Sequence, residues 1–79
     1  MFYYTYLLQS EKDGKLYVGW TDDLKNRLIM HNSGLVPSTR SRRPLVLKYC
    51  EICTDKMKAI KREKYLKTGF GRRYLKTRI

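Results

Sequence analysis

The chain has few acidic residues, one tryptophan, one histidine and no long apolar run. Its 79 residues include only seven aspartates and glutamates against eighteen lysines and arginines, and the formal net charge is +11. A charge of this size predicts a polyanionic partner, because a polyanion relieves the self-repulsion of the folded chain. A cationic membrane peptide would share the charge, but seven tyrosines spread through strand-like runs favour a folded domain that binds nucleic acid.

A membrane location is not expected from this sequence. No stretch approaches the roughly 20 apolar residues of a membrane span. Strand-like residues also follow Met1 directly, without the pattern of a targeting segment. We therefore expect a cytosolic protein with no membrane partner.

Zinc ligands are scarce as well. Cys50 and Cys53 form a C-x-x-C spacing, and His31 is the only histidine. A structural zinc site needs four ligands, so these residues do not complete one. A redox pair is the other interpretation, since such pairs usually lie at the start of a helix and Cys53 comes just before a predicted cap. We interpret both cysteines as small apolar residues near the end of a strand.

The first part of the chain has the pattern of a β-hairpin. Residues 2–9 and 16–20 are rich in tyrosine and other strand-forming types. Asp13-Gly14 between them is typical of a hairpin turn. The sequence therefore predicts two adjacent antiparallel strands, which bring the tyrosines of both close together.

A helix is predicted to follow the hairpin. Thr21 is placed to cap it, and Asp22 and Asp23 would put negative charge on its first turn. Gly34 would end the helix in a left-handed conformation. The helix is expected to run to about residue 32.

The remainder adds a loop, a third strand and two helices, expected at 35–44, 45–52, 54–68 and 72–79. The third strand is continuously apolar, which suits a buried central position. Gly69-Phe70-Gly71 is expected to break the long helix, with Phe70 and Leu75 packing back onto the sheet. The predicted fold is one α/β domain over residues 1–79, a three-stranded antiparallel sheet covered by helices in one layer pair.

Two residues of the first helix break its binary pattern. Leu24 and Leu28 define an apolar face at helical spacing, and Arg27 and His31 lie on its flank. Charged or polar residues beside an apolar helix face are expected at functional sites. Just ahead, Gly19 in the second strand would let backbone or a ligand approach closely.

The long second helix also carries a polar residue on its apolar side. Ala59, Ile60 and Leu66 form that side, and Glu63 lies among them at helical spacing. Two interpretations apply to this glutamate. It could form an ion pair with a neighbouring lysine, or it could bind a metal ion.

These residues form an ordered set: Tyr4-Thr5-Tyr6, Tyr17-Val18-Gly19, Arg27, His31 and Glu63. The set resembles the GIY-YIG nuclease family, and most of all its small stand-alone members, which are related to the N-terminal nuclease domain of a bacterial excinuclease. The resemblance covers nearly the whole chain. It departs from the pattern at Tyr4, where the name-giving motif has glycine, and after Glu63, where many members carry an asparagine; the last asparagine here is Asn32.

The resemblance implies a hydrolytic site with one metal ion on a concave face of the sheet. Glu63 would hold Mg²⁺ or Mn²⁺, Arg27 would bind the phosphate, and Tyr17 would be the general base with Tyr6 orienting water or phosphate. The tyrosines could otherwise simply fill the core. An ordinary tyrosine has a pKa of about 10, so either nearby positive charge must lower it or the proton must pass toward His31. The sequence leaves both routes open.

Contacts to nucleic acid are expected from Gly19, Arg40, Arg42, Arg43, Lys61, Arg62 and Lys67. The loop over 35–44 combines arginines with hydroxyls, which are the usual partners of the phosphate backbone. A solvated basic loop is the alternative.

The function predicted from all of this is metal-dependent hydrolysis of DNA, on single-stranded, branched or damaged substrates. RNA stays open as a partner. A monomer is expected, with a protein partner as one source of specificity. The alternative from another class is a non-catalytic nucleic-acid-binding module on a degenerate nuclease fold, and a weaker one is a basic RNA-associated protein without an active site. A binding module would need only lysines and arginines. The enzyme is therefore favoured by the presence together of the five candidate catalytic residues, Tyr6, Tyr17, Arg27, His31 and Glu63.

Overall fold

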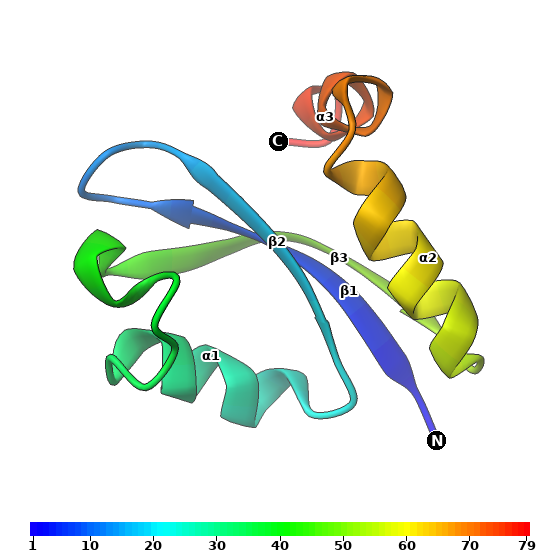
Figure 1. Ribbon diagram of the computed structural model, residues 1–79, viewed down its shortest axis with the longest axis horizontal. Coiled ribbons are helices and arrows are strands. Elements are labelled where there is room, and N and C mark those ends of the chain that lie inside the picture. Colours follow the sequence, from blue (N-terminus) through cyan, green and yellow to red (C-terminus); the bar gives the residue numbers. More distant parts are fainter.

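The sheet is built around its first strand. The computed structural model describes residues 1–79, and its strand order is β2-β1-β3, both pairs antiparallel (Figure 1). The central strand is β1 (Tyr3–Ser10), with β2 (Leu16–Thr21) and β3 (Leu45–Cys53) on either side. Gly14 has φ +72° in the β1–β2 turn, a conformation that favours glycine. The hairpin and the three-stranded antiparallel sheet are confirmed.

Three helices flank this sheet. They are α1 (Leu24–Asn32), α2 (Lys56–Leu66) and α3 (Gly69–Lys76), and a short 3₁₀ turn, Arg40–Arg42, interrupts the predicted loop after α1. The longest of them has 11 residues, and none is long and apolar enough to cross a membrane. The predicted order of elements is confirmed.

The helices cover both faces of the sheet, where we expected a single layer pair. On one face the core residues Tyr6, Leu8 and Leu45 pack against Tyr17 and against Leu24 and Leu28 of α1. On the other face the core consists of Leu7, Val18, Leu66 and Leu75, from β1, β2, α2 and α3. Because successive side chains of a strand point to opposite faces, the central strand is buried from Thr5 to Leu8. In Figure 1, α1 and α2 accordingly lie on opposite sides of the sheet.

The caps of α1 differ in part from those predicted. Asp23 is the N-cap, and its carboxylate accepts a hydrogen bond from the Asn26 N–H at 3.1 Å. Thr21 is instead the last residue of β2, where it is buried and its Oγ1 accepts from the Asp23 N–H. The predicted end of the helix is confirmed, since Gly34 has φ +80° and the N–H groups after the helix bond back to its last carbonyls.

Two predictions about apolar residues are wrong. The strand β3 is an edge strand and not the central one, and its Ile52 is 61% exposed. Phe70 is 69% exposed and does not pack on the sheet, whereas Leu75 is fully buried as expected. The break between the helices comes before Gly69, because α2 ends at Leu66. The glycines on either side of Phe70 belong to the first turn of α3, which Thr68 caps.

The two cysteines are free and half-buried on β3. They are three residues apart along the strand, so their side chains point to opposite faces of the sheet. No group of three or more histidine, cysteine or acidic side chains in the 79 residues could hold a metal ion. Interpreting the C-x-x-C spacing as two small apolar residues fits this placement.

Candidate active site

A buried histidine connects the central strand to the loop after α1. His31 is fully buried, its Nε2 lies 2.9 Å from the Tyr6 hydroxyl, and its Nδ1 lies 2.7 Å from Thr39 Oγ1. Burial, and after it the charge of Arg27, lowers the pKa of His31, so its imidazole is neutral at pH 7. Burial also raises the pKa of Tyr6, so the phenol keeps its proton. We assign the tautomer in which Nδ1–H donates to Thr39 Oγ1, which lets the Tyr6 hydroxyl donate to Nε2.

Gly19 makes room for Tyr6. The two residues lie directly opposite each other on β2 and β1. A Cβ atom at position 19 would lie 2.5 Å from the Tyr6 hydroxyl oxygen, closer than real atoms approach. The close approach predicted at this glycine is thus made by Tyr6. Because Gly19 is buried, its role is to seat that ring, and it does not offer a surface to nucleic acid.

Tyr17 packs beside the same histidine. Its ring meets the His31 ring edge to face, with 5.1 Å between the centroids. The Ser38 hydroxyl donates a long hydrogen bond of 3.5 Å to the Tyr17 hydroxyl. No hydrogen bond joins Tyr17 to His31, whose two nitrogens are already occupied. Direct proton transfer to His31, one of the two expected routes, would require one of those buried hydrogen bonds to break.

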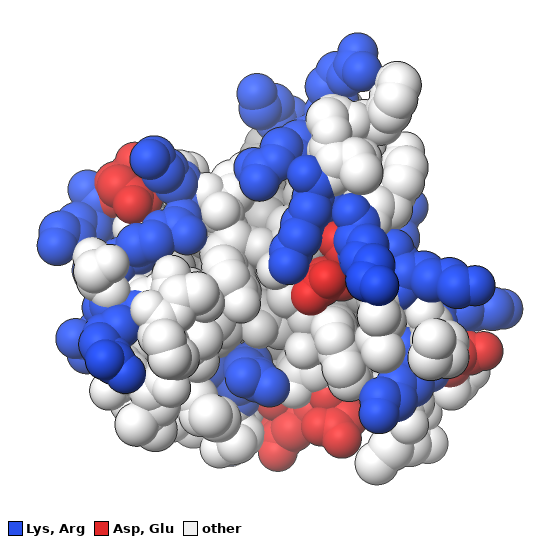
Figure 2. Space-filling model, in the orientation of Figure 1, with Lys and Arg blue, Asp and Glu red and all other residues white.

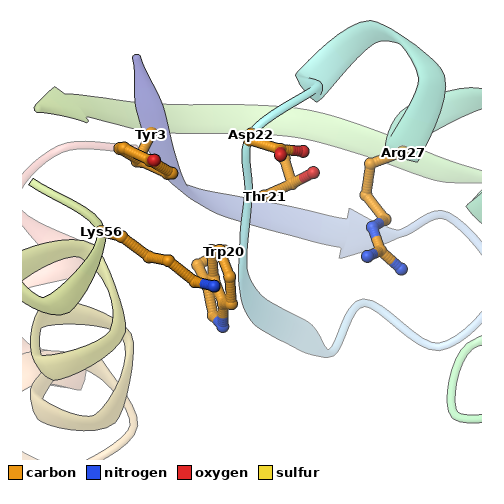
Figure 3. A pocket seen from close by; sticks show the side chains of 6 residues that line it. All are labelled: Tyr3, Trp20, Thr21, Asp22, Arg27 and Lys56. Carbon is orange, nitrogen blue, oxygen red and sulfur yellow. The ribbon is translucent and has the colours of Figure 1, made fainter. Parts of the chain in front are cut away.

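Arg27 reaches from α1 into an open cleft beside the end of β2. The cleft has a volume of about 240 Å³ and is lined by Tyr3, Trp20, Thr21, Asp22, Arg27 and Lys56 (Figure 3). The Arg27 guanidinium forms no ion pair in the structure. Its charge lowers the pKa of Tyr6, although burial outweighs this effect. Arg27 is therefore a half-buried cation, close to the tyrosines and free to bind an anion.

Glu63 lies on α2, the helix that packs against the opposite face of the sheet from Tyr6. Burial is the main cause of the raised pKa of Tyr6, the charge of Tyr17 is the next, and the negative charge of Glu63 raises this pKa by a smaller amount. The Glu63 side chain is only 18% exposed, and its one ion pair is with Lys67, 3.5 Å away and one turn further along α2. This contact matches the ion-pair interpretation that the sequence left open. The metal-ligand interpretation stays a proposal.

Comparison with known proteins decides the family. The family profile described as the GIY-YIG catalytic domain matches residues 2–76. The chain belongs to the GIY-YIG family. It is 40% identical to a UPF0213 protein of Staphylococcus saprophyticus over 94% of this chain and 90% of that one. A UPF0213 protein of Bacillus pumilus is 45% identical over 84% of this chain and 67% of that one.

A solved structure has the same fold. The solution NMR structure of a UPF0213 protein from Bacillus halodurans superposes with a TM-score of 0.61 at 30% identity, over 98% of this chain and 84% of that chain. Membership in the GIY-YIG family implies an endonuclease type of function and a nucleic-acid substrate. The names of these relatives state no substrate, metal or reaction.

The GIY-YIG site offers one carboxylate to a metal ion. Glu63 is the one carboxylate whose charge acts on Tyr6, and no group of three or more histidine, cysteine or acidic side chains could hold a metal ion. Mg²⁺ commonly binds through one or two carboxylates and completes its shell with water and substrate phosphates. The site therefore fits a Mg²⁺ or Mn²⁺ ion that the substrate helps to hold, and it does not fit a cluster of two metal ions.

The basic residues predicted to bind nucleic acid fall into two groups. Arg42 forms an ion pair with Asp13, and Arg62 a bidentate pair with Glu51, so both guanidinium groups already have partners. Lys67 is paired with Glu63, whereas Lys61 is exposed and forms no ion pair.

Arg40 and Arg43 are exposed and use only Nε to bond loop carbonyls, which leaves their outer nitrogens free. Figure 2 shows lysines and arginines gathered around this loop and along α2, on either side of a mostly uncharged strip. Arg40, Arg43 and Lys61 thus remain the candidates for phosphate contacts.

The hydrogen bond between Thr39 and His31 was not predicted from the sequence. The hydroxyls of the loop were expected to bind phosphate, but Thr39 is fully buried and bonds His31. The Asn32 side chain likewise bonds both backbone groups of Leu45 and so ties α1 to β3. A His-x₇-Thr spacing carries no signal of its own, because the contact depends on how the loop folds back.

Proposed function

We propose that this chain is a divalent-metal-dependent endonuclease that hydrolyses phosphodiester bonds in single-stranded, branched or damaged DNA. The observation that carries the proposal is the convergence of Tyr6, Tyr17 and Arg27 around His31, with the charge of Glu63 acting on the same tyrosine. A cytosolic location and a monomeric state belong to the same proposal.

Each residue has a distinct part in the proposed reaction. Arg27 binds the non-bridging oxygens of the scissile phosphate, since its guanidinium has no partner within the protein. Tyr17, in its phenolate form, accepts a proton from the attacking water and becomes the neutral phenol, and Ser38 donates to the oxygen that carries the negative charge before this step. Tyr6 is held as a donor to His31, so its oxygen keeps free lone pairs that can orient water.

His31 is a positioning residue in this proposal. It is neutral, fully buried and bonded at both nitrogens, so it fixes Tyr6 and does not exchange protons with solvent. Glu63 would hold the Mg²⁺ or Mn²⁺ ion. When bound, the ion supplies positive charge that stabilises the phosphorane and the leaving oxygen.

One observation favours a binding module as the second candidate. The Glu63 carboxylate is paired with Lys67, as in an ordinary α-helix of a protein without a metal site. In that case the chain would bind nucleic acid through its exposed cations and leave it uncut.

The test is a panel of labelled single-stranded, duplex and branched DNA, with an RNA of matched length, incubated with Mg²⁺, Mn²⁺ or EDTA. An endonuclease gives internal cleavage products with metal and none with EDTA. Binding of the same oligonucleotides without products in any metal would support the binding module and refute the proposed function.

A further inference from the structure

The cleft beside Arg27 contains an aromatic residue that the proposed reaction does not use. Trp20 follows Gly19 directly on β2 and belongs to neither core cluster. It is half-buried, and it lines the cleft together with Tyr3. Figure 3 shows the Trp20 indole and the Arg27 guanidinium on opposite sides of β2, with the Lys56 side chain extended toward the indole.

We propose that this cleft binds an unpaired nucleobase, stacked on Trp20, of a nucleotide next to the phosphate held by Arg27. The inference rests on the proposed function for the position of that phosphate. A nucleotide matches the chemistry of the cleft because it brings an aromatic plane for Trp20 and Tyr3 and a phosphate for Lys56. The one carboxylate in the cleft, Asp22, could accept a hydrogen bond from the exocyclic amino group of a base.

A bound nucleotide would replace the present contact of Trp20. Lys56 Nζ lies 5.6 Å from the centroid of the Trp20 ring, which is a weak contact for a cation at the surface. A base stacked on the indole makes the stronger contact of the two, and Lys56 would then pair with phosphate instead. The base must be unpaired, because a base inside a duplex presents only its edges and cannot stack on a side chain.

The chain carries its own probe for this contact, since Trp20 is its only tryptophan. The experiment titrates the protein in EDTA with single-stranded DNA of about 12 nucleotides, within the range of known single-strand sites. Tryptophan fluorescence and the anisotropy of a labelled strand are followed together. We expect quenching that saturates with the anisotropy. An abasic strand of the same length should bind without quenching, and a blunt duplex should quench little.

Two variants and a control complete the test. Trp20→Ala should weaken binding of the normal strand about 10-fold or more but leave binding of the abasic strand unchanged, because about 1.4 kcal/mol corresponds to tenfold. Trp20→Phe, measured by anisotropy, should retain most of the affinity. The matched control is Phe70→Ala, which removes an exposed aromatic side chain on α3, outside the cleft, and should bind like the wild type.

The outcomes separate this inference from the proposed function. Binding without quenching, or equal loss of affinity for the normal and abasic strands in Trp20→Ala, would overturn the base site even if the protein cleaves DNA. Base-dependent quenching in a protein that cuts nothing with Mg²⁺ or Mn²⁺ would support the base site and refute the nuclease.

Discussion

Glu63→Gln separates the metal-ligand role of this carboxylate from its ion pair with Lys67. The substitution keeps the size and helix propensity of the side chain but removes its charge. The control is Lys67→Gln, which breaks the same ion pair and leaves the carboxylate in place. Both variants lose the ion pair, but only Lys67→Gln keeps the carboxylate that could bind a cation.

The expected loss of stability is small in both variants. The pair is an i, i+4 pair with 3.5 Å between charged atoms, and the Lys67 side chain is 48% exposed. Exposed pairs of this kind contribute about 0.3–0.5 kcal/mol. In a domain of this size 1 kcal/mol shifts the melting temperature by about 4–8 °C, so each variant should melt within about 4 °C of the wild type. A buried pair would instead cost about 3–5 kcal/mol when one partner is removed.

The expected loss of cleavage is large in only one of them. Without the charge that is proposed to hold the metal ion, Glu63→Gln should cut at least about 100-fold more slowly, which corresponds to about 2.7 kcal/mol of transition-state stabilisation. Lys67→Gln should cut at close to the wild-type rate. The assay is single-turnover cleavage across a Mg²⁺ and Mn²⁺ series, beside melting curves. Equal cleavage by the two variants would refute Glu63 as the metal ligand.

Two further predictions concern the loop and the buried histidine. Replacing Arg40 and Arg43 together by alanine should reduce the slope of log affinity against log salt by up to about 1.4–1.8, because each lost phosphate contact contributes about 0.7–0.9; an unchanged slope would remove the loop from the binding surface. Arg42 is left out, because its ion pair with Asp13 supports the hairpin. The pKa of His31 is lower in the folded chain than in the unfolded chain, where it is about 6.5. Below about pH 6.5 the unfolded chain therefore binds a proton at His31 more readily than the folded chain does. The free energy of unfolding should fall as the pH falls below this value, by at most about 1.4 kcal/mol per pH unit. Chemical denaturation at pH 8 and pH 5 should show this fall in the wild type and not in His31→Gln, and an equal fall in both would contradict it.

Local chemistry made much of the fold predictable. Asp13-Gly14 fixed the hairpin, and Gly34 marked the end of α1, because few residues tolerate those backbone conformations. Arg27 and His31 stood out because they broke the apolar pattern of their helix. These features depend on residues close together in the sequence.

The remaining features depend on tertiary contacts and could not be predicted in this way. The apolar run of β3 looked central, but β1 is the strand that is buried on both faces, and Ile52 on β3 is exposed. The hydroxyls of the loop over 35–44 were expected to bind phosphate, but the loop folds inward and buries that of Thr39 on His31. Both threonine and aspartate are good N-cap residues. Because β2 extends to Thr21, the helix begins later and Asp23 is its N-cap.

The central claim is that Tyr17 takes part in metal-dependent cleavage of DNA. The most direct measurement is the single-turnover cleavage rate of wild type and Tyr17→Phe in Mg²⁺, with protein in excess over a single-stranded substrate and EDTA as the blank. The wild type should cut only with metal, and the variant should bind equally well but cut at least about 100-fold more slowly, because only the proton-accepting oxygen is lost. Near-normal cleavage by the variant, or no cleavage by wild-type protein that binds the substrate, would contradict this account.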